Sequence, residues 1–210
     1  MDKVKLKNGK SIEGDLVIPA KALGIVIFSH GSGSSRFSPR NNFVAQHLQK
    51  NRFATFLVDL LTEEENLVSD NRFNIELRTQ RLVESTRYVI DRTKTLRLPV
   101  GFFGSSTGAA SAIAAAAILR NKISAVVCRG GRPDLVTSHL YRVRAATLFI
   151  VGSLDHSIVT LNREAFAKVQ ATKSLKVIAG ASHLFEEPGT LEQVAELSSG
   201  WFSQHLARTG

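Results

Sequence analysis

Short, nearly continuous apolar runs alternate along this sequence with longer segments of mixed apolar and polar positions. Such a run is typical of a parallel strand covered on both faces, because neither face then needs polar residues. The runs that fit this description are 23–29, 53–60, 100–103, 123–128, 146–151 and 175–178. We therefore predict buried parallel strands at these places.

The segments between the runs predict helices. Ser38 before Pro39 indicates a helix start, because serine caps the first turn and proline loses no hydrogen bond there. Apolar residues within 82–90 recur at three- and four-residue steps, as on one face of an amphipathic helix. The last helix is expected to begin with a capping box formed by Thr190 and Gln193. The polar residues 63–65 and 69–71 are expected to be loop.

Alternating strands and helices predict an α/β fold with a doubly wound, mostly parallel sheet. The beginning of the chain differs, because Asn8-Gly9 favours a tight turn and predicts an antiparallel hairpin within residues 6–19. The connections are too short for a large lid domain, and no linker interrupts the pattern. We expect residues 1–210 to form a single domain.

Composition excludes few functions, but it argues against nucleic acid and membranes as binding partners. The 210 residues carry a formal net charge of +9, yet the basic residues are scattered, which favours solvated helix faces over a nucleic-acid site. The longest apolar stretch, 109–119, is shorter than the roughly 20 residues that span a bilayer, so no membrane partner is expected. Cys128 is the single cysteine and no signal peptide is visible, so we expect a cytoplasmic protein. The oligomeric state stays open.

Gly104-Ser105-Ser106-Thr107-Gly108 is the most informative stretch of the chain. It has the pattern G-x-S-x-G between a predicted strand and a predicted helix, which is the setting of a nucleophile elbow. In that turn the serine backbone is strained, so the positions two before and two after it must lack bulk. We expect Ser106 to be the nucleophile and Ser105 to point elsewhere.

A serine nucleophile needs a base and an acid that orients the base. The carboxyl ends of parallel strands form the sites of such sheets, and Asp155 and His183 follow two later predicted strands. The order Ser106, Asp155, His183 is the order that hydrolases with this elbow use. Asp134 is the alternative acid, while Asp59 precedes the elbow and is expected to be structural. Cys128 lies inside an apolar strand and is expected to be an inert thiol.

The oxyanion of such a reaction needs two N–H donors. Thr107 is expected to supply one backbone N–H, and Ser32 the other from the loop after the first parallel strand, with Gly33 as the alternative. Arg36 and Arg129 lie in loops that could face the site, as do Arg40 and Arg132, and we predict that Arg36 and Arg129 bind an anionic substrate group. No metal-ligand spacing or phosphate-binding loop is present, so we expect no metal and no cofactor.

These motifs together resemble the α/β-hydrolase superfamily, and more narrowly its dienelactone-hydrolase-like members. The segments that carry the resemblance are His30-Gly31-Ser32-Gly33, the elbow, Gly152-Ser153-Leu154-Asp155 and Gly180-Ala181-Ser182-His183-Leu184-Phe185. Arg129-Gly130-Gly131-Arg132-Pro133-Asp134-Leu135 and residues 183–189 are similar to a bacterial subgroup that also occurs fused to phosphoribosyltransferase domains. Dienelactone hydrolases proper have cysteine at the elbow, where this chain has Ser106, so the resemblance does not imply lactone specificity.

The sequence thus predicts a serine hydrolase that cleaves an ester or lactone of a small substrate through an acyl-enzyme. Two alternatives stay open at this point. The chain could be a hydrolase-fold protein that binds without catalysis, or it could use the same triad for acyl transfer or peptide cleavage.

Overall fold

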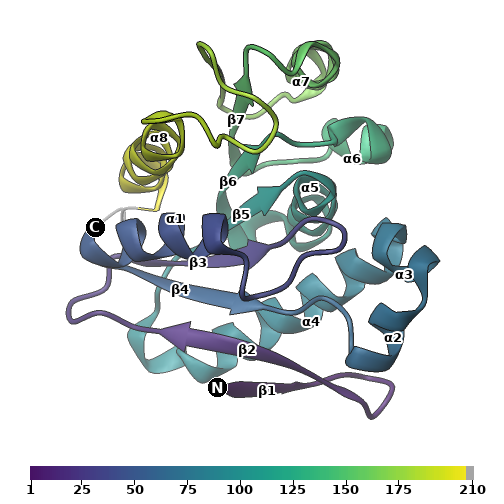
Figure 1. Ribbon diagram of the computed structural model, residues 1–210. Helices are drawn as coiled ribbons and strands as arrows, with labels where there is room; N and C mark the ends of the chain where they lie inside the picture. Colours follow the sequence, from purple (N-terminus) through teal and green to yellow (C-terminus); the bar gives the residue numbers. More distant parts are fainter. Residues whose placement is uncertain (207–210) are drawn as a thin grey trace.

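The computed structural model describes residues 1–206, except for the side chain of Thr95. Its centre is an eight-stranded sheet with the strand order β1-β2-β4-β3-β5-β6-β7-β8 (Figure 1). The strands are β1 (Asp2–Lys5), β2 (Ser11–Val17), β3 (Gly24–Ser29), β4 (Phe53–Val58), β5 (Val100–Ser105), β6 (Ile123–Arg129), β7 (Ala146–Gly152) and β8 (Lys173–Ile178).

Most of the sheet is parallel, and its antiparallel part is confined to the N-terminal edge. Strands β3 to β8 pair in parallel, whereas β1 pairs antiparallel with β2, and β2 with β4. The chain passes from β3 outward to β4 and then returns to β5 on the other side of β3. The connections after β3 and β5 therefore diverge at neighbouring strand ends, which is where sites form in such sheets.

Helices cover both faces of the sheet. The helices are α1 (Pro39–Lys50), α2 (Glu63–Leu67), α3 (Ser69–Phe73), α4 (Ile75–Arg92), α5 (Thr107–Leu119), α6 (Thr137–Leu140), α7 (His156–Lys168) and α8 (Thr190–His205), with short 3-10 helices η1 (Lys94–Leu96), η2 (Arg120–Lys122) and η3 (Pro133–Val136). Helices α1 and α8 lie on one face and α4 to α7 on the other (Figure 1). No helix among residues 1–206 combines the length and apolarity needed to cross a bilayer.

Each strand feeds two apolar cores, because its side chains alternate between the faces. In β3, Ile25 and Ile27 pack into the core under α4 and α5, while Val26 and Phe28 pack under α1 and α8. Burial on both faces explains why these strands are continuous apolar runs.

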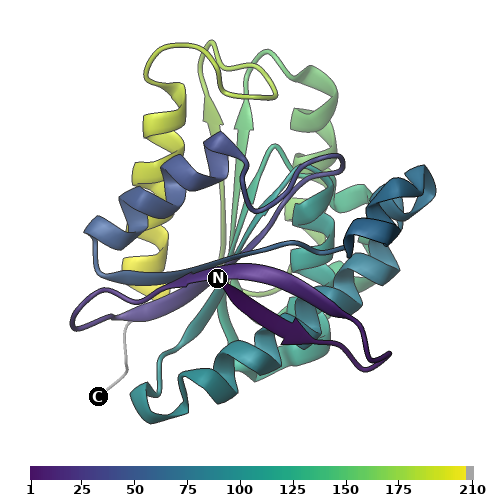
Figure 2. The same ribbon diagram turned by 60° about the horizontal axis from the view of Figure 1, so that its bottom comes forward.

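The predicted fold class is confirmed, including the antiparallel hairpin and the helix that starts at Ser38. The hydroxyl of Ser38 accepts a hydrogen bond from the Asn41 N–H, as its capping position requires. The connections hold no large lid, and the longest excursion is the pair α2 and α3 at the edge of the molecule beside α4 (Figure 2).

Two local predictions are wrong. Residues 63–65 and 69–71 lie in helices α2 and α3, because Thr62 and Glu65 form a capping box that starts a helix within the polar stretch. The final helix is capped by Gly189, not by Thr190. The Thr190 hydroxyl instead donates to the Glu187 carbonyl, so Thr190 and Gln193 form no capping box.

Candidate active site

The turn between β5 and α5 places Ser106 at the carboxyl edge of the sheet. Its backbone has φ 52° and ψ −123°, a conformation that residues with a side chain rarely adopt. The Ser106 N–H donates to the Arg129 carbonyl at 3.0 Å, and the Ser106 carbonyl accepts from the Arg132 N–H at 3.1 Å. The strain is thus held by bonds to the end of β6 and the loop after it, which is the geometry expected of an elbow.

The two glycines that flank the elbow are required by packing. A Cβ at Gly104 would lie 2.5 Å from the Cα of Ala109, well inside ordinary contact distance. A Cβ at Gly108 would run into the carbonyl oxygens of Ser29 and His30 at the end of β3. The expected absence of bulk at these positions is confirmed, and α5 can therefore pack directly against the β3 strand end.

The three side chains expected to form a triad lie together. The His183 Nε2 is 3.3 Å from the Ser106 Oγ, and its Nδ1 is 2.6 Å from the Asp155 Oδ2. Asp155 stands at the start of α7, and His183 in the loop between β8 and α8. That loop is braced where the Ser182 N–H donates to the Glu187 Oε2 at 3.0 Å.

The hydrogen bonds of His183 define its useful tautomer. An ionised carboxylate only accepts hydrogen bonds, so Nδ1 must carry the proton that is shared with Asp155. The lone pair of Nε2 then faces the Ser106 hydroxyl, ready to take its proton. The His183 side chain is 37% exposed and that of Asp155 15%, so the base opens to solvent while the acid beneath it is largely shielded.

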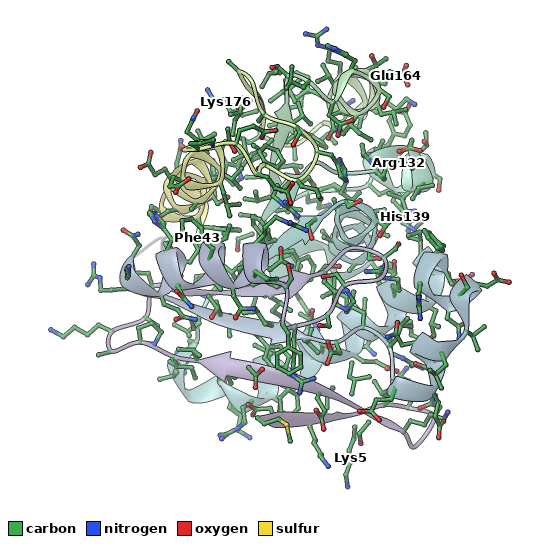
Figure 3. The ribbon with its side chains drawn as sticks, in the orientation of Figure 1. Lys5, Phe43, Arg132, His139, Glu164 and Lys176 are labelled. Atoms are coloured by element: carbon green, nitrogen blue, oxygen red, sulfur yellow. The ribbon has the colours of Figure 1, made fainter. Side chains whose placement is uncertain are left out.

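The two alternative acids are bonded to arginines, and the alternative nucleophile is buried. Both carboxylate oxygens of Asp134 accept from the guanidinium of Arg132, which lies beside α6 (Figure 3). Asp59 accepts from the backbone and side chain of Arg36. Cys128 is buried, which raises the pKa of its thiol. The geometry thus favours Asp155 and Ser106 over these residues.

Ser32 and Thr107 are brought together, but not in the way that the sequence predicts. The Ser32 N–H, expected to face the substrate, donates to the Thr107 Oγ1 at 2.8 Å, and the two hydroxyl oxygens are 2.7 Å apart. Arg78 of α4 reaches the same pair, with its Nη1 3.1 Å from the Thr107 Oγ1 and 3.3 Å from the Ser32 Oγ. The Thr107 N–H has no hydrogen-bond partner among residues 1–206. The alternative, Gly33, has a positive φ of 68°.

His30 holds the loop after β3, which carries Ser32, against the residues that follow β4. Its Nε2 accepts from the Leu60 N–H at 3.1 Å, so the proton sits on Nδ1, which is 2.9 Å from the Gly31 carbonyl oxygen. Burial, and then the charge of Arg78, lower the pKa of His30 to about 4. The imidazole is therefore neutral near pH 7 and has a structural place in the loop.

The family to which the chain belongs follows from its match to a family model. Residues 22–199 match the model described as an alpha/beta hydrolase domain. The chain belongs to the α/β-hydrolase family. The family match makes the chain an enzyme of hydrolase type, and Ser106, Asp155 and His183 all lie within the matched range.

Relatives and solved structures resemble the hydrolase to different degrees. Proteins named as phosphoribosyl transferases from the CDC 1551 and H37Rv strains of Mycobacterium tuberculosis are 51% identical to it over 199 residues. That match covers 95% of this chain but 45% of each relative, so the hydrolase spans less than half their length. A crystal structure of dienelactone hydrolase from Anabaena variabilis matches with a TM-score of 0.94 and 47% identity, over 98% of this chain and 96% of that one. Est1E from Butyrivibrio proteoclasticus shares the fold, with a TM-score of 0.80 at 15% identity over 97% of each chain. The resemblance to dienelactone-hydrolase-like proteins is confirmed.

Of the two arginines predicted to bind substrate, Arg36 is taken up by carboxylates. Its guanidinium pairs with Glu13 at 2.8 Å, with Asp15 at 3.3 Å and with Asp59. These contacts tie the β2 strand to the loop before α1. Arg36 therefore has a structural role in the hydrolase, and we do not retain it as a substrate-binding residue.

Arg129 differs, because its charge is buried and forms no ion pair with any residue of the described range 1–206. The side chain is 6% exposed, and its Nε and Nη1 atoms are buried without a hydrogen-bond partner. Its guanidinium packs 5.6 Å from the ring centre of Phe185, two residues after His183. Burial, and then the charge of Arg40, lower the pKa of Arg129 to about 10.

Sequence reasoning missed Arg78, although a signal was present. Arg78 lies four residues before Leu82, on the stripe that includes Val89, so the helix pattern already placed it on the buried face of α4. An arginine in an apolar stripe marks a buried charge, and in the hydrolase that charge lies behind Ser32 and Thr107.

Proposed function

We propose that this α/β hydrolase is a serine esterase or lactonase that acts on small substrates through an acyl-enzyme. The observation that carries the proposal is the chain of contacts from Asp155 through His183 to Ser106. A hydroxyl, a correctly oriented imidazole and a shielded carboxylate in that order are what acyl transfer by serine requires.

The reaction would proceed in two halves. The Ser106 Oγ attacks the carbonyl carbon while the His183 Nε2 takes the hydroxyl proton, and Asp155 stabilises the imidazolium that forms. Collapse of the tetrahedral intermediate expels the alcohol, which takes that proton and leaves an ester on Ser106. Water, deprotonated by His183, then attacks this ester and releases the acid. The Thr107 N–H at the start of α5 would hold the oxyanion together with Ser32, which lies next to it.

Loss of the Ser106 hydroxyl tests this assignment. We expect Ser106→Ala to lower kcat on p-nitrophenyl butyrate by at least about 10³-fold, since attack by the serine is the step removed. The neighbouring Ser105→Ala is the matched control, because Ser105 is the last residue of β5 and the hydrogen bonds of the His183 ring go to Ser106 and Asp155. It should keep most of the activity.

Covalent labelling separates the proposed hydrolase from a protein that only binds. A fluorophosphonate probe should label the wild type and Ser105→Ala but not Ser106→Ala. Wild-type turnover in Ser106→Ala, or a folded wild type that neither labels nor hydrolyses any ester, would refute the proposal. Analysis of the products with an added alcohol or amine distinguishes hydrolysis from acyl transfer.

We also propose that Arg129 favours substrates that carry a negative charge. A buried guanidinium without a partner is costly, and an anionic group on the substrate would supply the missing hydrogen bonds. The Ser106 N–H bonds to the Arg129 carbonyl, so this residue lies one strand away from the nucleophile.

A pair of esters with the same leaving group tests this preference. We expect Arg129→Met to raise the ratio of KM for mono-p-nitrophenyl succinate to KM for p-nitrophenyl butyrate about tenfold. Arg36→Met, whose charge is held by carboxylates, is the control and should leave this ratio unchanged. Equal changes in the two KM values for Arg129→Met would contradict an anion site.

A further inference from the structure

Three polar groups behind the nucleophile form a closed hydrogen-bond network. Thr107 Oγ1 lies 2.8 Å from the Ser32 N atom, 3.1 Å from the Arg78 Nη1 and 2.7 Å from the Ser32 Oγ. The distances alone do not say which hydroxyl donates to the other, but the number of lone pairs does.

The directions follow from what each group can accept. A hydroxyl oxygen has two lone pairs, and on Thr107 both are taken by N–H groups, one from Ser32 and one from Arg78. The Thr107 proton must then be donated, and the Ser32 Oγ is the acceptor in reach. The Ser32 Oγ thus accepts this proton. Of the two protons on Arg78 Nη1, one goes to the Arg72 carbonyl at 2.8 Å, and the other points to the Thr107 Oγ1 at 3.1 Å, with the Ser32 Oγ farther away at 3.3 Å. The proton of Ser32 itself has no acceptor among residues 1–206.

The residue before Ser32 lies beside the nucleophile. The loop that carries Ser32 passes over the elbow so closely that a Cβ on Gly31 would be 3.4 Å from the Cβ of Ser106. The N–H of Thr107 is the other uncommitted donor at this place. The Ser32 N–H, by contrast, is already bonded and would have to leave Thr107 to serve a substrate.

The network also carries an unbalanced positive charge. Arg78 is 1% exposed and forms no salt bridge among the described residues. Its other contacts are the carbonyl oxygens of Arg72, at 2.8 Å, and His30. A buried guanidinium held only by neutral acceptors favours a negative charge nearby, and an oxyanion at Ser106 would supply one.

We propose that the Ser32 hydroxyl is an oxyanion donor, with its proton oriented by Thr107 Oγ1 and Arg78. The inference rests on the proposed esterase function and names the group of Ser32 that donates to the oxyanion, the hydroxyl in place of the backbone N–H. The Ser32 O–H and the Thr107 N–H donate to the carbonyl oxygen as it becomes negative, and no covalent bond at Ser32 is made or broken. The Thr107 hydroxyl and Arg78 are positioning residues, because they act through Ser32.

Removing and restoring the hydroxyl tests the proposal. Ser32→Ala keeps the backbone N–H and loses only the O–H, and we expect kcat on p-nitrophenyl butyrate to fall about 10²–10³-fold with little change in KM. Ser32→Thr, which restores a hydroxyl, should recover most of this loss. Ser34→Ala in the same loop is the matched control. If Ser32→Ala turns over like the wild type, the backbone N–H is the donor and the proposal is wrong.

A transition-state analogue separates catalysis from folding. A trifluoromethyl ketone forms a tetrahedral adduct with the nucleophile, so its Ki should rise across Ser32→Thr and Ser32→Ala in proportion to the fall in kcat/KM. A purely structural role would lower the active fraction and leave Ki unchanged. Failure of the proposed function is distinct from this outcome, because then Ser106→Ala would retain the turnover of the wild type.

The positioning role of Thr107 has a signature of its own. Thr107→Val keeps the N–H and should lower kcat about tenfold in the wild type, yet add almost nothing in Ser32→Ala, where no proton remains to orient. Additive losses in the double variant would show that the Thr107 hydroxyl does not act through Ser32, and would overturn that part of the proposal.

Discussion

Arg36 lies in the loop after β3 and Arg78 contacts that loop, but their buried charges have different surroundings. Arg36 lies under the N-terminal hairpin, and its side chain is 11% exposed. It is surrounded by the carboxylates of Glu13, Asp15 and Asp59. Arg78 lies behind the elbow, is more deeply buried and contacts only carbonyl and hydroxyl oxygens. The charge of Arg36 is thus neutralised by carboxylates, whereas that of Arg78 has no carboxylate beside it within residues 1–206.

The pKa values move in opposite directions for this reason. Burial by itself would lower the pKa of Arg36, but Asp59, Glu13 and Asp15 more than offset it and raise that pKa. At Arg78 burial acts alone and lowers the pKa to about 10. Arg78 is still protonated near pH 7, so the fold keeps an uncompensated charge beside its candidate nucleophile. A site that must stabilise a developing anion is the place where such a cost is useful.

Among the variants that compare the two arginines, replacing Arg78 gives the largest expected effect on kcat. Arg78→Met should lower kcat about 10²-fold, because the positive charge and the orienting N–H groups are lost together. Arg78→Lys keeps the charge but not the fork of donors, and should fall between the wild type and Arg78→Met. Steady-state kinetics on p-nitrophenyl butyrate checks this, with denaturant unfolding to confirm that each variant folds. A folded Arg78→Met with wild-type kcat would show that Arg78, like Arg36, does not contribute to catalysis.

The neutral histidine beside Arg78 makes stability depend on pH. Its pKa is about 4 in the folded chain and 6.5 ordinarily, so between these values the unfolded state binds the proton that the folded state refuses. Stability should therefore be full above pH 6.5 and fall as the pH drops toward 4, by roughly 3 kcal/mol in the free energy of unfolding.

Urea unfolding at several pH values measures this dependence. His30→Asn should show a shallower pH slope between 4 and 6.5 than the wild type, while His156→Asn, an exposed position, should match the wild type. Parallel slopes for wild type and His30→Asn would mean that His30 is protonated in the folded chain.

Arg36→Met is expected to have the smallest effect on kcat, and it tests whether a charge that is paired with carboxylates contributes to stability alone. We expect it to lower the free energy of unfolding by roughly 2 kcal/mol, since three carboxylates lose their cation but are partly exposed to water. The kcat of the folded fraction should stay near that of the wild type. A large fall in kcat with unchanged stability would assign Arg36 to catalysis after all.

The fold was predictable because its signals are local. Apolar runs that are covered on both faces, a serine–proline helix start and glycines around a strained turn each depend on neighbours along the chain. The order of Ser106, Asp155 and His183 could be predicted as well, because topology brings the carboxyl ends of parallel strands to one edge. The helices at 63–67 and 69–73 were missed because a polar composition hid the capping box at Thr62.

The hydrogen-bond partners of the site residues could not be predicted in the same way. Whether Arg36 meets carboxylates or a substrate depends on β2, which carries Glu13 and Asp15 and pairs with β4, a strand distant in the sequence. The Ser32 N–H bonds to a side chain 75 positions away. Such pairings depend on the packing of the whole chain and produce no periodic pattern in the sequence. Arg78 was detectable only from its place on the buried stripe of α4.

The close packing at Gly108 has a consequence for engineering. Since no Cβ fits between α5 and the carbonyl oxygens of Ser29 and His30, the elbow and the loop bearing Ser32 are fixed to each other and cannot be widened separately. We expect variants selected for bulkier substrates to accumulate changes in the loops after β6 and β8, at residues 133–141 and 184–189, which leave out the elbow contact of Arg132 and the base His183. The close packing on one side of the nucleophile would thus confine such changes to the other side.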